Sequence, residues 1–279
     1  MGVDFLMIAI LIYAHKDKSQ IQRLVNTLKN EQIDIYVHAD RKFDIDNFEN
    51  AFLIKKRYDI KWGDPSIINS IIFSLEEIRK NKKYDYYILL SGQDYPIVSP
   101  DEIINFLNNN SGKEFIEFKK IGNDKNDWNV SNRYTYYHFY NNEFLDKISR
   151  HIYNKRNFVK NWVIYGGSLW WTLTDEAIEY IINTYYDLKL YNKIKWTLCF
   201  DEIFFQSILC NSKFKDNIVN KNYRYIDWSD HIAGKNSGNP NVLGVKDYDK
   251  IVNSGDFFAR KFDINVDEKI LDMLDEVRK

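Results

Sequence analysis

The chain has 279 residues, a length that suits one large domain or two small ones. Its 39 basic and 40 acidic residues give a formal net charge of −1, which argues against a surface built to grip nucleic acid or anionic lipid. With 11 glycines, 4 prolines and 2 cysteines, it has no long low-complexity linker and no disulfide framework. We therefore predict a single domain over residues 1–279.

Apolar periodicity predicts that strands and helices alternate in the first half of the chain. Residues 5–13 form an apolar run that is too short to span a bilayer and lacks the basic start and cleavage site of a signal peptide. A buried first strand fits this run. In chain order we then expect a helix with apolar positions 21–28, a strand over 33–38, a helix over 65–78, a strand over 84–90 and a helix that Ser99 caps.

The second half is less regular. Residues 119–165 are polar and aromatic with weak periodicity, and we expect irregular connections with one helix near 142–155. Further helices are expected from Thr174, from Asp201-Glu202 and over Val266–Val277. This alternation predicts an α/β fold whose central, mainly parallel sheet is flanked by helices, with ligands at the carboxyl ends of the strands.

Several common catalytic motifs are absent from the sequence. It has no phosphate loop, no Rossmann glycine fingerprint after the first strand, no nucleophile elbow and no pair of histidines at metal-ligand spacing. These absences weaken the cases for a nucleotide hydrolase, a dehydrogenase, a serine hydrolase and a zinc enzyme. What remains is a set of polar residues that follow predicted strands: His15, His38-Ala39-Asp40 and Ser91–Pro96.

The order of these segments resembles the core-2/I-branching β-1,6-N-acetylglucosaminyltransferase family (glycosyltransferase family 14), which includes the peptide O-xylosyltransferases. The resemblance extends from about Ile8 to Asp263. It rests on seven segments in the same order: Ile8–His15, Tyr36–Lys42, Trp62-Gly63, Leu89–Pro96, Gly167–Trp170, Asp201-Glu202 and Phe258–Asp263.

The resemblance implies a GT-A type nucleotide-sugar-binding fold and an inverting transferase that works without a metal. It also implies a UDP-sugar donor, with N-acetylglucosamine expected as the sugar. In most GT-A enzymes an Asp-x-Asp motif after a core strand holds a metal, whereas here Ser91–Asp94 has a single carboxylate. Asp-x-Asp does occur at 44–46 and 247–249, but neither follows a core strand.

Arg260 and Lys261 match the family's basic pair, which neutralises the leaving UDP in place of a metal. Two fixed cations can stabilise the charge that develops on a departing diphosphate. The alternative is an ordinary surface pair, and the flanking phenylalanines, Phe257, Phe258 and Phe262, favour the binding role because they anchor the pair in apolar packing.

Glu202 matches the family's catalytic base. An inverting displacement needs one carboxylate to take the proton of the acceptor hydroxyl, and the start of a helix favours the ionised form. The alternative is a first-turn acidic residue that only stabilises its helix. Asp201 is expected to cap this helix.

Ala14, His15 and Asp40 match the residues that hold the uridine, with Asp40 accepting hydrogen bonds from the nucleoside. Otherwise Asp40 is a turn former, as strand-end aspartates often are.

Asp94, Ser168, Trp170 and Trp171 are expected to bind the sugar or the acceptor. Asp94 has a second reading as a brace for the Tyr95-Pro96 turn, and the two tryptophans have a second reading as core aromatics.

The leading hypothesis is thus a UDP-sugar-dependent transferase that needs no metal and acts on an oligosaccharide, a lipid-linked glycan or a peptide. We expect it in the cytoplasm or at the inner face of the membrane, building a surface glycan. The asparagine, lysine, isoleucine and tyrosine content suggests an AT-rich bacterial genome. UDP-xylose is the rival donor. The other hypotheses are a catalytically silent sugar-nucleotide or glycan-binding module and a metal-dependent GT-A transferase.

Overall fold

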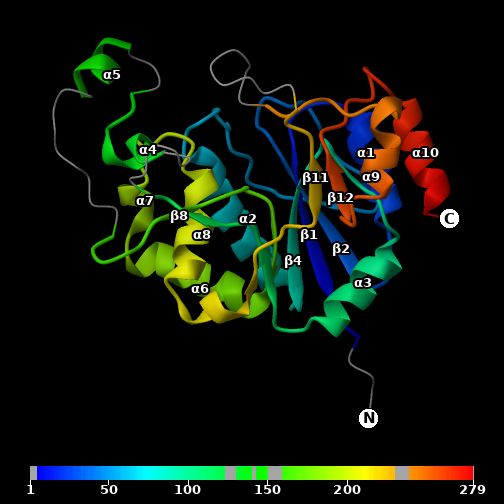
Figure 1. The fold of residues 1–279 in the computed structure, drawn as a ribbon, viewed down its shortest axis with the longest axis horizontal. Coiled ribbons are helices and arrows are strands. Elements are labelled where there is room, and N and C mark those ends of the chain that lie inside the picture. Colours follow the sequence, from blue (N-terminus) through cyan, green and yellow to red (C-terminus); the bar gives the residue numbers. More distant parts are fainter. Residues whose placement is uncertain (1–4, 123–129, 140–142, 150–158, 230–238, 279) are drawn as a thin grey trace. The chain divides into compact units, whose positions relative to one another are not determined.

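The computed structural model describes residues 5–122, 130–139, 143–149, 159–229 and 239–278 (Figure 1). They form two compact units, each assembled from separate stretches of chain. The first unit draws on Met1–Lys55, Tyr84–Ser111 and Tyr223–Lys279, and the second on Lys56–Lys83 and Gly112–Asn222. The single domain predicted from the sequence stays a prediction.

Parallel strands in the order β4-β1-β2-β3 form the centre of the first unit. Every residue of β1 and β4 is buried, as expected for parallel strands that are covered on both faces. This burial explains the apolar runs in the sequence, and the predicted buried first strand is confirmed. The strands are β1 (Ile8–Ala14), β2 (Ile33–Ala39), β3 (Phe52–Leu53) and β4 (Tyr86–Ser91).

A smaller sheet in the same unit joins segments far apart in the chain, in the order β11-β12-β5. Strand β12 (Phe258–Arg260) runs parallel to β11 (Arg224–Ile226) and antiparallel to β5 (Asp94–Pro96). These pairings bring Asp94, Arg224 and Arg260 into one sheet, although their strands lie far apart in the chain.

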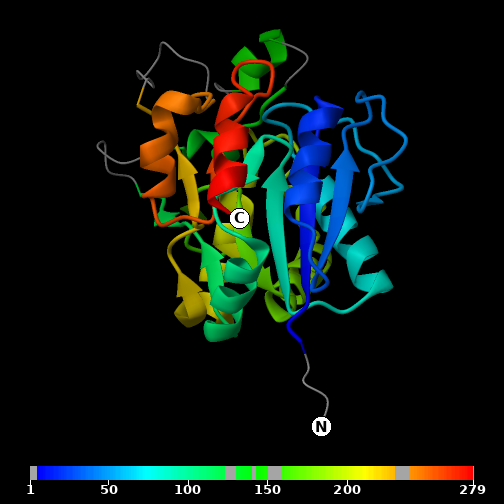
Figure 2. The same cartoon turned by 90° about the vertical axis from the view of Figure 1, so that its right-hand side faces the viewer.

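Helices α1 and α10 of the first unit lie side by side (Figure 2), and the Arg23 guanidinium joins them by donating to Asp272 at 2.6 Å and Asp275 at 2.5 Å. The predicted cap at Ser99 is confirmed, because Ser99 and Glu102 form a reciprocal capping box. The helices are α1 (Lys18–Thr27), α3 (Pro100–Asn109), α9 (Tyr248–Val252) and α10 (Lys269–Val277), with a 3₁₀ turn at Val245–Asp247.

The second unit has its own short strands, β10-β6-β9, in which β10 is parallel and β9 antiparallel to β6. They are β6 (Glu114–Ile116), β9 (Trp171–Thr174) and β10 (Ile218–Val219); β7 (Lys119–Lys120) pairs with β8 (Tyr165–Gly166). Its helices are α2 (Ser66–Asn81), α4 (Asn132–Thr135), α5 (Glu143–Ser149), α6 (Asp175–Asp187), α7 (Leu190–Lys193) and α8 (Asp201–Cys210), with a 3₁₀ turn at Lys213–Asn217.

The predicted α/β fold with a mainly parallel sheet flanked by helices is confirmed. Two helix predictions need correction. The last helix starts at Lys269, and Val266 lies before it, 67% exposed. The helix expected near 142–155 covers Glu143–Ser149, and residues 150–155 lie outside the described part of the chain.

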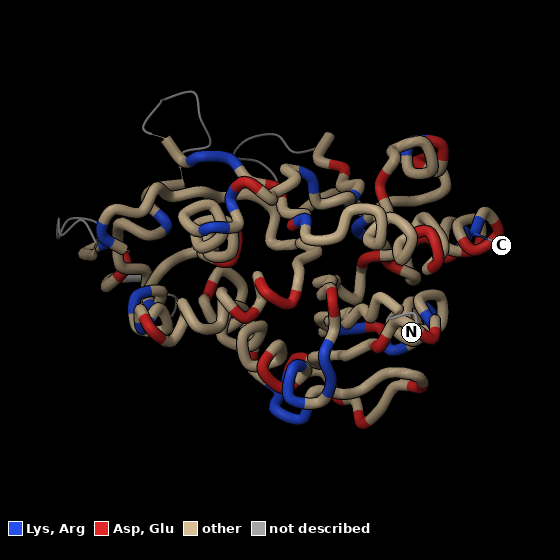
Figure 3. Tube along the Cα trace, turned by 90° about the horizontal axis from the view of Figure 1, so that it is seen from below, with Lys and Arg blue, Asp and Glu red and all other residues tan. Residues whose placement is uncertain are grey.

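Basic and acidic residues are interspersed along the described trace (Figure 3). Among the described residues, no helix combines the length and the apolar character that crossing a membrane would require.

Candidate active site

The carboxyl ends of β1, β2 and β4 lie at one edge of the parallel sheet in the first unit. Their register pairs Ala14 with Ala39 and Tyr13 with Ser91. The residues that follow, His15, Asp40 and the turn after Ser91, therefore share this edge. It is the edge at which open α/β sheets bind ligands.

Asp40 is 8% exposed and shapes the turn that follows β2. Its backbone N–H donates to the Ala14 carbonyl at 2.7 Å, and its Oδ1 accepts from the Lys42 N–H at 2.8 Å. Desolvation of the ring lowers the pKa of His15, and the Lys16 ammonium adds to this effect while the Asp40 carboxylate opposes it. Asp40 is thus a turn former that also lies within electrostatic reach of His15. The nucleoside-binding role of Ala14, His15 and Asp40 stays a prediction.

Asp94 lies at the centre of a buried ion pair with Arg224. Arg224 Nε lies 2.5 Å from Asp94 Oδ1, and the side chains are 1% and 0% exposed. Asp94 Oδ2 accepts from the Ser91 N–H at 2.7 Å and from the Ser91 hydroxyl. Arg224 Nη2 also donates to the Leu89 carbonyl at 3.0 Å. In this structure Asp94 ties β4, β5 and β11 together, and its expected contact with a sugar stays a prediction.

Arg260 stands opposite Asp94 in the pairing of β12 with β5. Its Nε lies 3.7 Å from Asp94 Oδ2, and its side chain is 16% exposed. Desolvation lowers the pKa of Arg260, and the Asp94 carboxylate opposes that shift. The buried carboxylate thus orients a guanidinium that is still partly open to solvent.

Lys261 and Lys16 complete a group of three cations with Arg260, which we call the cation cluster. Desolvation lowers the pKa of Lys261, and Arg260 and then Lys16 lower it further. Lys16 Nζ is bonded to Asp263 Oδ2 at 2.5 Å. Asp263, and Asp17 at 3.4 Å, balance part of this charge and raise the pKa of Lys16. The cluster still groups side chains of the kind that bind phosphate.

Gln20, 1% exposed, holds the two loops of this site together from α1. Its Nε2 donates to the Gly92 carbonyl at 2.9 Å and to the Phe262 carbonyl at 3.1 Å, and its Oε1 accepts from the Ile264 N–H at 2.7 Å. Phe262 directly follows Lys261, so Gln20 fixes the backbone that presents this lysine.

Lys16, Gln20 and Arg224 were not predicted as site residues. A glutamine on the apolar face of α1 was a usable signal for Gln20, because a buried amide needs partners. The sequence contains no comparable signal for Arg224, because this residue meets its partner Asp94 only through the β11-β12-β5 pairing.

In the second unit, Glu202 lies in the first turn of α8 and is paired with Arg133 of α4, whose Nη1 donates to the Glu202 carboxylate. The Glu202 side chain is 38% exposed and that of Arg133 is 23% exposed. Asp201 is the first residue of α8, and the cap position belongs to Phe200, so the predicted capping role is corrected. Desolvation and then the Glu202 charge raise the pKa of Asp201 to about 7.

Gly167 fixes the loop that approaches the start of α8. Its N–H donates to the Glu202 carbonyl at 2.8 Å. A Cβ at this position would lie 2.1 Å from the Glu117 carbonyl oxygen, so only glycine permits this close backbone approach. Gln206 of α8, fully buried, reinforces the loop by donating to the Ser168 carbonyl at 2.6 Å.

The three residues predicted to bind sugar in this unit differ in exposure. Ser168 is half-buried, Trp170 is 8% exposed, and Trp171 has no exposed surface and packs against Phe205 with ring centroids 5.5 Å apart. The structure places Trp171 in the core. Its predicted contact with a sugar, like those of Ser168 and Trp170, stays a prediction.

The described residues contain no group of three or more His, Cys, Asp or Glu side chains arranged to hold a metal ion. Of the Asp-x-Asp residues, Asp46 is 87% exposed and Asp247 accepts from the Gly244 N–H at 3.0 Å. Metal independence is taken up below as a proposal.

Comparison with known proteins identifies the family of this chain. A family profile described as Core-2/I-Branching enzyme matches residues 8–252, a region that contains Glu202 but ends before Arg260. Xylosyltransferase 2 of Rattus norvegicus and of Homo sapiens are each 26% identical over 299 residues, covering 96% of this chain and 33% of the relative. Xylosyltransferase 1 of Rattus norvegicus is 25% identical, covering 96% and 35%.

The profile covers most of the chain, which therefore belongs to the Core-2/I-branching enzyme family. The chain spans about a third of the length of the curated relatives it matches.

Solved structures match less closely. The S. aureus TarS 1-349 structure has a TM-score of 0.38 and 13% identity, covering 76% of this chain and 57% of TarS. A197 from STIV has a TM-score of 0.30 and 13% identity, covering 62% and 68%.

Proposed function

We propose that this chain is an inverting, metal-independent glycosyltransferase of the GT-A type, which moves a sugar from a UDP-sugar to a hydroxyl of its acceptor. The cation cluster is the observation that carries the proposal. Lys16, Arg260 and Lys261 gather at the edge of the sheet where ligands bind, and a fully buried Asp94–Arg224 pair orients Arg260.

The cation cluster supplies what a bound metal supplies in many transferases of this type. As the bond between the sugar and UDP breaks, negative charge grows on the β-phosphate, and fixed cations lower the energy of that state. Burial, and then repulsion by Arg260 and Lys16, lower the pKa of Lys261, and a bound diphosphate would relieve the repulsion. Asp40, with Ala14 and His15, holds the uridine at the neighbouring strand ends.

Glu202 acts as the general base in the proposed reaction. The acceptor oxygen forms a new bond to the anomeric carbon from the face opposite UDP, and its proton passes to the Glu202 carboxylate. The bond from the anomeric carbon to the phosphate oxygen breaks, and its electron pair leaves with UDP. Ser168 and Trp170 are the proposed contacts to the sugar or acceptor, because the side chains of Asp94 and Trp171 have no exposed surface.

N-acetylglucosamine is the first expected sugar, and xylose is the second because the similar curated proteins are named xylosyltransferases. The proposed acceptor is an oligosaccharide, a lipid-linked glycan or a peptide. We propose that the protein acts in the cytoplasm or at the inner face of the membrane in the synthesis of a bacterial surface glycan.

Measuring UDP release tests the proposal. The purified protein is incubated with UDP-N-acetylglucosamine, UDP-xylose, UDP-glucose and UDP-galactose, with and without EDTA. We expect release from one donor, the same rate in EDTA, and an anomeric configuration in the product opposite to that of the donor. Activity abolished by EDTA and restored by Mn²⁺ would overturn metal independence.

The Arg133–Glu202 pair favours a second candidate, a catalytically silent sugar-nucleotide or glycan-binding module. The Arg133 guanidinium occupies the carboxylate that the acceptor hydroxyl would have to reach. If the protein is silent for this reason, it should bind UDP tightly but release none from any donor, and Arg133→Ala should restore measurable turnover.

A further inference from the structure

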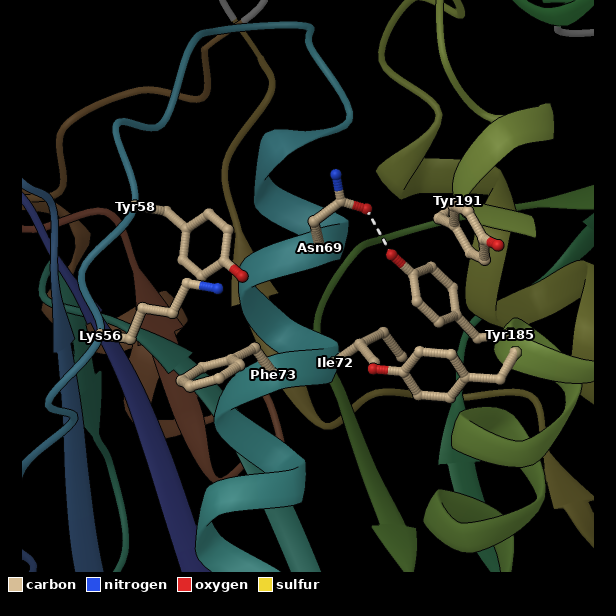
Figure 4. A pocket seen from close by; sticks show the side chains of 8 residues that line it. Lys56, Tyr58, Asn69, Ile72, Phe73, Tyr185 and Tyr191 are labelled. Carbon is tan, nitrogen blue, oxygen red and sulfur yellow. Dashed lines mark hydrogen bonds between the residues drawn. The ribbon is translucent and has the colours of Figure 1, made fainter. Parts of the chain in front are cut away.

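The second unit contains a pocket of about 380 Å³ (Figure 4). Its volume falls within the range of roughly 300–1,000 Å³ that is typical of small-molecule sites. Helix α2 runs between the two sides of the pocket (Figure 4). The segment before α2 supplies one side, and α6 and α7 supply the other. Aromatic side chains line most of it.

The aromatic rings are arranged in two groups on either side of the pocket (Figure 4). Tyr58 and Phe73 lie on one side, with ring centroids 6.0 Å apart, and Tyr185 and Tyr191 on the other, 5.9 Å apart. Tyr185 is 6% exposed, whereas Tyr191 is 41% exposed. Flat apolar faces are therefore presented to whatever enters between them.

Polar groups are placed among these rings. The Tyr185 hydroxyl donates to Asn69 Oδ1 at 2.7 Å, and Asn69 stands between the two aromatic groups (Figure 4). Lys56 Nζ lies 4.7 Å from the centroid of Phe73 and 5.0 Å from that of Tyr58, which holds its ammonium over the rings. Tyrosine, asparagine and lysine together offer donors and acceptors beside apolar faces.

A pyranose ring has the matching chemistry. One of its faces carries axial C–H groups that pack on an aromatic ring, and its edge carries hydroxyls that bond to amide, phenol and ammonium groups. A nucleobase also stacks on tyrosine. A nucleotide would additionally bring phosphates, which need several cations. Lys56 is the one cation that lines the pocket, so the lining favours a sugar over a nucleotide.

Resting on the proposed function, we propose that this pocket binds a sugar unit of the acceptor glycan. The pocket belongs to the same compact unit as the base: Tyr185 packs edge-on against Phe204, with centroids 6.1 Å apart, and Phe204 lies on the helix that begins with Asp201 and Glu202. A glycan held by Tyr185 and Tyr191 is thus carried by the unit that carries Glu202, whereas the cation cluster belongs to the other unit.

Saturation-transfer NMR with chitotetraose, a lacto-N-neotetraose and maltotetraose tests the pocket directly. We expect at least one of them to bind with millimolar affinity or better, and Tyr58→Ala and Tyr191→Ala each to weaken that binding about tenfold or more. Both residues are at least partly exposed, so the variants should fold, which circular dichroism checks. Phe144→Ala, which removes a 71% exposed aromatic outside the pocket, is the matched control.

Enzyme kinetics separate the pocket from the transfer reaction. Tyr58→Ala and Tyr191→Ala should raise KM for a glycan acceptor while leaving KM for the donor and the acceptor-free hydrolysis of the UDP-sugar unchanged. Suppose that the wild type binds an oligosaccharide, that these variants do not, and that the wild type releases no UDP. This result would support the pocket proposal and overturn the proposed function. The pocket proposal fails if no oligosaccharide binds, or if both variants bind like Phe144→Ala.

Discussion

Arg224 places its Nε 2.5 Å from Asp94 Oδ1 in the interior of the first unit, where neither side chain has more than 1% of its surface exposed. Both charges of such a buried ion pair have lost their hydration, so the pair is stable only if its geometry and its additional hydrogen bonds compensate for that loss. Arg260 Nε lies 3.7 Å from Oδ2 of the same carboxylate. The pair is therefore a support for the cation cluster as well as for the fold.

Removing one partner of this pair should destabilise the protein strongly. Arg224→Met leaves the Asp94 charge buried without its main partner, and a loss of about 3–5 kcal/mol in the free energy of unfolding is expected. Urea unfolding measures it. The matched control is Arg79→Met, which breaks the half-exposed Arg79–Asp175 pair and should cost about 0–1 kcal/mol. Equal losses in both variants would contradict a special role for the buried pair.

Arg260→Ala should weaken UDP binding and lower kcat/KM. Loss of one preorganised group that stabilises the leaving diphosphate costs about 2–4 kcal/mol in the transition state. Calorimetry with UDP and steady-state kinetics in EDTA measure the two effects. Lys29→Ala removes an exposed cation elsewhere in the first unit and should change neither. A variant that binds UDP like the wild type would remove Arg260 from the site.

Asp40→Ala should raise KM for the donor more than it lowers kcat, because contacts to the nucleoside are the same in the ground and transition states. A lost hydrogen bond to a charged group predicts a rise of about 10- to 100-fold. Asp40→Asn is the informative partner, since its side-chain oxygen can still accept from the Lys42 N–H as Asp40 does. If both variants lose thermal stability but keep UDP affinity, Asp40 is a turn residue alone.

Glu202→Gln should leave donor affinity nearly intact and cut kcat by about 10²–10⁴-fold, the effect of losing a positioned general base. The amide keeps the volume and can still accept from Arg133, but it cannot take a proton. Slow acceptor-independent hydrolysis of the UDP-sugar should persist. Wild-type turnover in this variant would contradict the role of Glu202 as the general base.

The stability of the second unit should depend on the protonation of Asp201. Its pKa is raised from 3.8 to about 7 by desolvation, so between about pH 4 and 7 the folded protein keeps a proton that the unfolded chain releases. Raising the pH through this window therefore lowers the free energy of unfolding, by up to roughly 4 kcal/mol, with no further loss above it. Asp201→Asn should remove this contribution.

Urea unfolding of both proteins at pH 4.5, 6 and 7.5 measures the difference. The exposed Asp187→Asn on α6 is the control and should follow the wild type. A wild-type curve that runs parallel to that of Asp201→Asn at all three pH values would contradict a protonated Asp201 carboxyl in the folded protein.

The sequence predicted the framework of the first unit well because its signals are local. The apolar runs of β1 and β4 and the capping box of Ser99 and Glu102 depend on residues close in the chain. The edge that carries His15, Asp40 and Ser91 follows from parallel strands alone, whose carboxyl ends must coincide.

The partners of the site residues could not be predicted in the same way. Arg224 meets Asp94 only through a sheet that joins three distant segments, and Arg133 meets Glu202 from a stretch of weak periodicity. Trp171 shows a further limit: a tryptophan that stacks on sugar and one that fills a core have the same sequence signature. Exposure distinguishes the two, and exposure is a property of the fold.

The alternation of the two units along the chain bears on how the protein is made. A chain emerging from the ribosome completes the stretches of the second unit at Asn222, whereas the first unit still lacks β11 and β12 at that point. More than a hundred residues separate Asp94 in β5 from Arg224 in β11. During synthesis the Asp94 carboxylate therefore lacks its partner until Arg224 has been made, and it is open to solvent or to chaperones in that time. The carboxylate that orients Arg260 is thus among the early residues of its unit to be synthesised and among the last to be neutralised.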